Sequence, residues 1–181
     1  VQFQEAHRTI IGHFRHEIGH YYWHMLVEGI CEPAFIEVFG DFSNPTYADA
    51  QERYYNDGAR TNWKGNYISA YATMHPWEDF AETFATYLDI VSVLDTALHM
   101  GFSETSDPIV SDLAAMVADY GKLGVVLNEM NRAMGLIDLV PGVIAPPVIV
   151  KLQFIHDLVR RAQLRDATEH VAEAAATPAD V

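Results

Sequence analysis

Histidine is concentrated in one short stretch near the start of the chain. The twelve residues HFRHEIGHYYWH, positions 13–24, hold four of the nine histidines and one glutamate. Histidine carries protons near neutral pH and is a common metal ligand, so this density indicates either a metal site or an unusual polar face. The function that the sequence supports depends on which of the two applies.

Part of this stretch has the spacing of a zinc site. His16, Glu17 and His20 form the pattern HExxH. Residues four apart on a helix lie one above the other, so two imidazoles can reach one Zn²⁺ through nitrogen. Glu17 would lie beside the open coordination position, where a general base for a bound water is needed. The alternative is a set of surface histidines or histidines satisfied in the core; we interpret His13 and His24 as flanking groups rather than ligands.

The histidines lie in a helix predicted from about Thr9 to Gly29. Apolar residues recur there with a helical period, and we expect them to form the core face: Ile11, Phe14, Ile18, Tyr22 and Met25. The four histidines fall on the opposite side of this helix. Gly19 lies inside the motif and costs about 1 kcal/mol of helix propensity relative to alanine. A close approach by another backbone would explain it.

A catalytic zinc ion needs a third protein ligand and an open fourth position. The layout HExxHxxGxxH is excluded, because positions 23 and 26 are Trp23 and Leu26. A second helix, predicted from Pro76 to about Met100, offers carboxylates instead. Proline suits the first position of such a helix. Its expected apolar stripe comprises Phe80, Phe84, Tyr87, Leu88 and Val91.

Two glutamates, Glu78 and Glu82, fall on the other side of this second helix, four residues apart. They form either an acidic surface pair or part of a metal site. Like charges at this spacing repel slightly, and a nearby cation would reverse that effect. In the metal interpretation Glu78 coordinates zinc, and Glu82 accepts a hydrogen bond from a ligating imidazole.

The rest of the sequence indicates a mainly α protein. A short helix is expected in TYADAQERYYNDG, one or two helices in the region 107–135, and another begun by the prolines at 146 and 147. No repeat and no run of alternating strands is found. We expect one catalytic domain over residues 1–165 and a C-terminal tail over 166–181.

The composition excludes several classes of partner. The net charge is −14 and no cluster of lysine and arginine occurs, so nucleic acid and anionic membranes are poor partners. The longest apolar run, residues 136–150, is interrupted by Asp138 and three prolines and is too short to cross a bilayer. No targeting signal is recognised, which favours a cytoplasmic location, although the chain begins at Val1 rather than at a methionine.

The segments HFRHEIGHYYW, SAYATMHPWEDFAETFATYL and NEMNRAMGLIDLVPGV resemble a family of bacterial zinc-binding metallopeptidases that is gluzincin-like and largely uncharacterised. The resemblance extends to about Gln163, and its first two segments are the specific ones. It implies a zincin-like catalytic domain with an active-site helix and a glutamate helix. Family members often carry a cysteine-rich zinc ribbon upstream, which this sequence does not contain.

The resemblance also implies roles for individual residues. In lethal-factor-type gluzincins the first glutamate of the second helix binds zinc, and a tyrosine seven residues upstream stabilises the oxyanion. That position here is Tyr71, with His75 as a rival donor. We therefore expect a zinc peptidase acting on peptides or proteins, with Glu17 as general base and with residues 57–75 lining the cleft. The alternatives are a zinc hydrolase acting on another amide or ester, and a non-catalytic helical module with a structural or vestigial metal site.

Overall fold

The computed structural model describes residues 9–102 and 110–176, with side chains described as far as Thr168. These residues contain helices and no strand, which confirms the mainly α prediction. The elements are α1 (Ile10–Leu26), α2 (Glu32–Phe39), α3 (Tyr47–Asp57), the short 3₁₀ helices η1 (Trp63–Gly65) and η2 (Tyr71–Thr73), α4 (Pro76–His99), α5 (Leu113–Ala133) and α6 (Pro146–Ala176).

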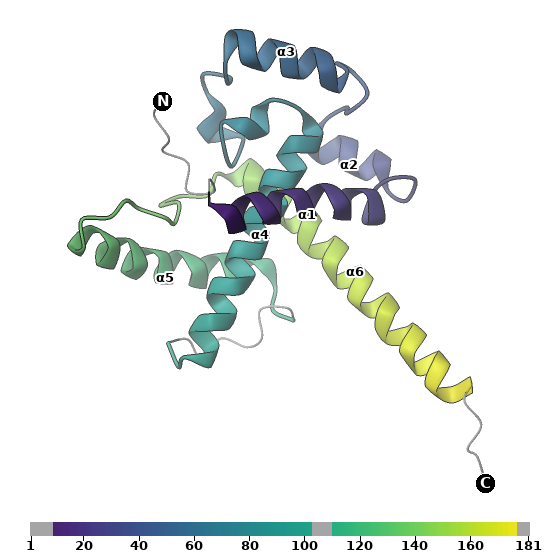
Figure 1. Ribbon diagram of the computed structural model, residues 1–181. Coiled ribbons are helices and arrows are strands. Elements are labelled where there is room, and N and C mark those ends of the chain that lie inside the picture. The colour runs from purple at the N-terminus through teal and green to yellow at the C-terminus, as the bar shows by residue number, and fades with distance from the viewer. Residues whose placement is uncertain (1–8, 103–109, 177–181) are drawn as a thin grey trace.

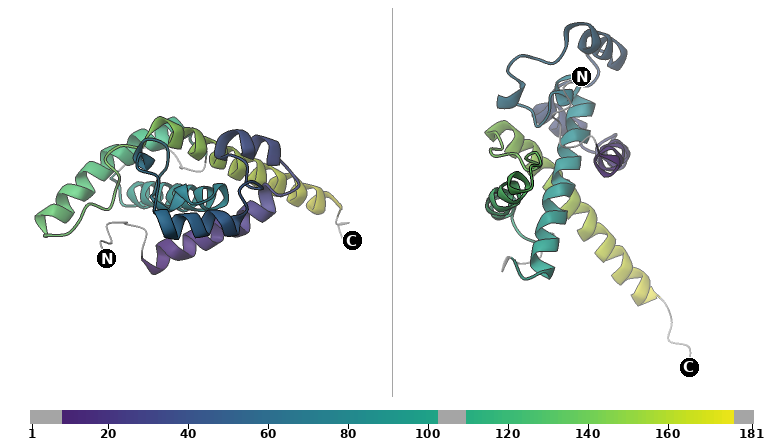
Figure 2. Two further views of the ribbon diagram at one scale, coloured as in Figure 1. Left: turned by 90° about the horizontal axis from the view of Figure 1, so that it is seen from above. Right: turned by 60° about the vertical axis from the view of Figure 1, so that its left-hand side comes forward.

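Helix α4 is the central element of the fold. It packs against α1, α5, α6 and η2, and the views in Figures 1 and 2 show the other helices arranged around it. The predicted start at Pro76 is confirmed, with proline in the first turn. His75 precedes it as the cap, and its Nδ1 accepts a hydrogen bond from the backbone N–H of Trp77 at 3.1 Å.

Aromatic side chains from α2 and α4 form one part of the core. Phe35 and Phe39 of α2 pack against Phe80 of α4, with ring centroids about 6 Å apart or less. Phe154 of α6 closes the group from another side. Each buried phenylalanine contributes roughly 1.5–3 kcal/mol from burial of apolar surface. Helix α2 was not predicted, although Glu32 and Pro33 are favourable residues for its first turn.

The predicted core face of α1 is wrong. Ile11, Phe14, Tyr22 and Met25 are each at least 40% exposed, and only Ile18 of the predicted set is partly buried. The buried residues of α1 are instead Gly12, His16, Gly19 and Trp23. The helix therefore turns its glycine and histidine side, not its aliphatic side, toward α4.

Close packing between two backbones explains this orientation of α1. A Cβ added to Gly19 would lie 2.8 Å from Ala81 Cα and 3.1 Å from Ala81 O, so only glycine permits the approach. Arg15 forms an ion pair with Asp89 of α4 and donates a hydrogen bond to Ser92 Oγ at 2.8 Å. The buried face of α1 is therefore set by the close contact at Gly19 and by polar side chains, and not by the apolar periodicity of its sequence.

Helix α6 joins the core through its first half and extends away from it through its second (Figure 1). It continues past residue 165 to Ala176, so the division into a domain and a tail stays a prediction. One buried ion pair links it to α4, between Lys151 Nζ and Asp79 Oδ2 at 2.6 Å. Lys151 also donates to the carbonyl of Asn66 at 2.8 Å, which ties the segment before η2 to the same point.

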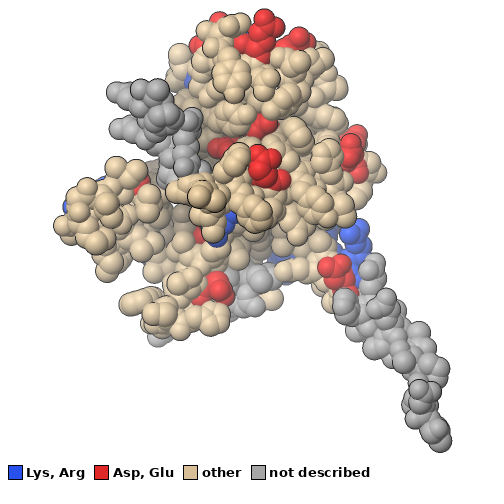
Figure 3. Space-filling view, viewed as in Figure 1, with Lys and Arg blue, Asp and Glu red and all other residues tan. Residues whose placement is uncertain are grey.

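The surface reflects the acidic composition. In Figure 3 carboxylate side chains are scattered over the visible face, and the largest group of basic side chains in view lies near α6. None of the helices in the described part of the chain combines the length and hydropathy needed to cross a bilayer.

Candidate metal centre

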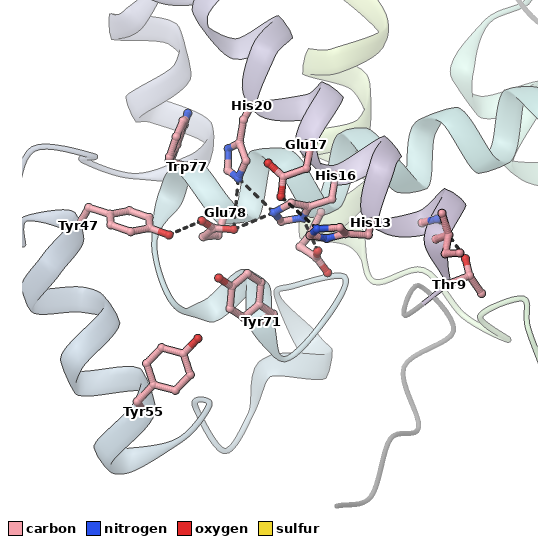
Figure 4. Close-up of a pocket in the computed structure, with 13 residues that line it drawn as sticks. Thr9, His13, His16, Glu17, His20, Tyr47, Tyr55, Tyr71, Trp77 and Glu78 are labelled. Carbon is pink, nitrogen blue, oxygen red and sulfur yellow. Dashed lines mark hydrogen bonds and ion pairs between the residues drawn. The ribbon is translucent and has the colours of Figure 1, made fainter.

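The crossing of α1 and α4 brings the three predicted ligands together (Figure 4). His16 Nε2 lies 3.0 Å from Glu78 Oε2, His20 Nε2 lies 3.5 Å from the same oxygen, and the two Nε2 atoms are 3.1 Å apart. Among the described residues, these three form the group of histidine, cysteine and acidic side chains whose spacing could hold a metal ion.

The spacing of these atoms fits a tetrahedral zinc ion. Ligands at ~2.0–2.1 Å from zinc in that geometry lie roughly 3.3 Å from one another, within the observed range of 3.0–3.5 Å. Glu78 is 2% exposed, and its Oε2 faces the Nε2 atoms of both imidazoles. A buried carboxylate is costly unless a positive charge is close to it, and a bound cation would supply that charge. The residues present therefore fit the metal that their sequence pattern implies.

A second carboxylate orients the first imidazole. Glu82 Oε1 lies 2.6 Å from His16 Nδ1, so this nitrogen carries the proton that it donates, and Nε2 is left to face Glu78. Burial alone would lower the pKa of His16. The hydrogen bonds and charges of Glu78 and Glu82 outweigh burial and raise this pKa to about 9. Without a metal, Nε2 therefore carries a second proton at neutral pH, and metal binding must displace that proton.

Glu78 itself is held in its charged form. Burial would raise its pKa, but hydrogen bonds from His16 and His20 overcome that effect and lower the pKa to about 2. Tyr47 adds a further hydrogen bond, from its hydroxyl to Glu78 Oε1 at 2.8 Å. The carboxylate is therefore ready to bind a cation throughout the physiological pH range.

The three candidate ligands lie in the wall of a cleft of about 740 Å³, a size typical of small-ligand sites. Glu17 also lines this cleft, and its side chain is more than half exposed to solvent. Tyr71 faces the ligands from η2, with its ring centroid 6.0 Å from that of His16. Burial and the nearby charge of Glu78 raise the pKa of Tyr71 well above its usual value, so its hydroxyl stays protonated.

His13, His24 and His75 lie outside the group of three candidate ligands. Both ring nitrogens of His75 are used, one by the Trp77 N–H and the other by the carbonyl of Phe42 at 3.1 Å. His75 is also absent from the lining of the cleft, whereas Tyr71 is part of it. His24 pairs with Glu28 at 2.8 Å, and His13 lies at the edge of the cleft, largely exposed.

Sequence reasoning missed two aromatic residues of the site. Tyr47, the first residue of α3, contacts Glu78 across 31 positions of the chain. Trp77 lies against the His20 ring, with centroids 3.9 Å apart. Trp77 adjoins the predicted ligand and could have been considered for that reason. No spacing rule connects Tyr47 to either ligand helix, because its position depends on how α3 folds back over the cleft.

Comparison with known proteins gives matches over most of the chain. Proteins named only as uncharacterized, one from Mycobacterium bovis and two from Mycobacterium tuberculosis, are 41% identical to it over 167 residues. The match covers 88% of this chain but 49% of each relative, so the chain spans about half the length of these proteins. No solved structure matches the chain. A sequence profile of the family described as "Putative zinc-binding metallo-peptidase" matches residues 1–158, and the chain therefore belongs to that family.

Proposed function

We propose that this chain is the catalytic domain of a gluzincin-like zinc peptidase, in which His16, His20 and Glu78 hold the metal. The observation that carries the proposal is the convergence of two imidazole nitrogens and one carboxylate oxygen, 3.0–3.5 Å apart, in the wall of an open cleft. A zinc ion held by three protein ligands lowers the pKa of its water toward 7 and polarises a carbonyl in its open position.

The side chains around the ligands supply the remaining chemistry. Glu17 belongs to the same helix as both histidines and faces the cleft, where it accepts a proton from the attacking water and delivers it to the leaving amine (Figure 4). Tyr71, protonated and on the opposite wall, donates a hydrogen bond to the oxygen on which negative charge develops. Glu82 keeps His16 in the tautomer whose Nε2 lone pair is free to bind.

The proposal is tested by proteolysis of an unfolded protein, such as reduced casein, and of a library of quenched fluorescent peptides. Zinc-loaded wild-type protein should cleave them, and removal of zinc with a chelator should abolish cleavage. Glu17→Gln should keep one zinc per chain and lose about 10²–10⁴-fold in kcat. Glu28→Gln, which changes an exposed carboxylate beyond the cleft, is the matched control and should cleave normally.

Two results would contradict the proposal. Cleavage by Glu17→Gln at the wild-type rate would remove this residue from the chemistry. Zinc-loaded wild-type protein that hydrolyses simple esters or acyl amides but no peptide would identify a hydrolase of another substrate class.

A further inference from the structure

Tyr47 links α3 to a candidate ligand through a hydrogen bond. Its hydroxyl donates to Glu78 Oε1 at 2.8 Å, while Glu78 Oε2 faces His16 and His20 (Figure 4). The two oxygens of this carboxylate therefore have different partners. Oε1 accepts a hydrogen bond from the Tyr47 hydroxyl, and Oε2 is directed at the position that the metal would fill.

The ring of Tyr47 is fixed independently of its hydroxyl. It packs edge-on against His75, with centroids 5.3 Å apart, and against Trp77 at 5.7 Å. Thr46 caps the first turn of α3 by accepting the N–H of Asp49, which sets the position from which Tyr47 reaches across the cleft. Loss of the hydroxyl alone would therefore leave the packing of the ring in place.

We propose that Tyr47 is a positioning residue of the metal site. It restricts Glu78 to binding the cation through Oε2 alone, because its hydroxyl already occupies Oε1. This inference rests on the proposed zinc site but not on peptide cleavage. Hydrogen-bonding partners of metal ligands typically change metal affinity or activity by about 10–100-fold when they are removed.

The test compares Tyr47→Phe with Tyr55→Phe, each of which removes one phenolic hydroxyl from α3 at the cleft. Tyr55 is 72% exposed and lies farther from Glu78 (Figure 4). Zinc affinity is measured by competition between the zinc-free protein and a fluorescent chelator, with ZnCl₂ as the probe. Tyr47→Phe should bind zinc about 10–100-fold more weakly than wild type, and Tyr55→Phe should bind within about twofold of it.

A double-mutant cycle separates positioning from a general effect on the fold. In a Glu78→Ala background, Tyr47→Phe should cause no further loss of zinc affinity, because the group that it positions is gone. Unfolding midpoints of the zinc-free variants are recorded alongside. The inference is overturned if Tyr47→Phe and Tyr55→Phe bind zinc equally, or if Tyr47→Phe weakens binding as much in the Glu78→Ala background as in wild type.

Cobalt provides a second readout that does not depend on affinity. Loss of the Tyr47 hydroxyl frees Glu78 Oε1, so the carboxylate can bind Co²⁺ through both oxygens. The coordination number of the Co²⁺ ion then rises. The visible absorption of the Co²⁺-loaded Tyr47→Phe variant should therefore be weaker than that of Co²⁺-loaded wild type. Identical spectra would refute the single-oxygen constraint. If Tyr47→Phe weakens zinc binding as expected but the zinc-loaded wild type cleaves no peptide, the proposed function is refuted and this inference stands.

Discussion

Replacement of Gly19 by alanine tests whether the contact between α1 and α4 builds the metal site. Alanine favours a helix over glycine by about 1 kcal/mol, so the substitution would stabilise an isolated α1. In the folded protein, however, the new Cβ would lie 2.8 Å from Ala81 Cα, where ordinary contacts begin at 3.4 Å. The neighbouring atoms belong to the backbone and cannot rotate away.

The two helices must therefore separate locally by about 0.6 Å to accept the methyl group. Overpacking of this kind costs typically ~1–3 kcal/mol, which equals or exceeds the gain in helix propensity. We expect a net loss of up to ~2 kcal/mol in the free energy of unfolding. His16 and His20 flank Gly19 while Glu78 lies one turn from Ala81, so the same shift spreads the ligands and should lower zinc affinity at least about tenfold.

Gly121→Ala is the matched control, because Gly121 is also helical and a Cβ added there would meet no neighbouring atom within 4 Å. It should gain up to about 1 kcal/mol and leave zinc affinity unchanged. Urea denaturation of the zinc-free proteins and chelator competition measure the two quantities. Our account of the helix contact is refuted if Gly19→Ala is at least as stable as wild type and binds zinc with the same affinity.

Two further predictions concern the buried charges. Lys151→Met removes the partner of Asp79 inside the fold and should lower the free energy of unfolding, measured by urea denaturation, by ~3–5 kcal/mol. The double variant Lys151→Met/Asp79→Asn should recover much of this loss, because it leaves no unpaired charge. A loss below about 1 kcal/mol in Lys151→Met would mean that the pair is solvated. The zinc-free protein should lose stability as pH rises from 6.5 to about 9, because the folded-state pKa of His16 lies above its unfolded value. Its protonated form contributes up to ~3 kcal/mol, fully present below pH 6.5 and lost as pH rises through about 9. Urea denaturation of the zinc-free protein at pH 6.5 and pH 9 measures this loss of stability. If the His16→Gln variant shows the same loss between the two pH values, another group is responsible for it.

The parts of the site that were predictable follow local rules. The i, i+4 spacing of His16 and His20 places both rings on one side of a helix, and Pro76 predicted the start of α4. Glu78 was proposed because catalytic zinc requires a third protein ligand and the layout HExxHxxGxxH is excluded, and its Oε2 lies 3.0 Å from His16 Nε2. Glu82 followed from the same helix periodicity, and it lies 2.6 Å from His16.

The parts that were not predictable depend on packing between distant segments. The apolar period of α1 indicated the wrong buried face, since the contact at Gly19 depends on the shape of α4 and not on the sequence of α1. Tyr47 was missed for a similar reason. Its contact with Glu78 requires α3 to fold back over the cleft, and no local pattern specifies that arrangement.

The central claim is that His16, His20 and Glu78 bind one metal ion and leave a coordination position open. An anomalous difference map recorded at the zinc absorption edge, from crystals grown with ZnCl₂, tests it most directly. We predict a single peak ~2.0–2.2 Å from His16 Nε2, His20 Nε2 and Glu78 Oε2, with no fourth protein ligand. A peak bound by other residues, a fourth protein ligand at this position, or no peak at the crossing of α1 and α4 would contradict the claim.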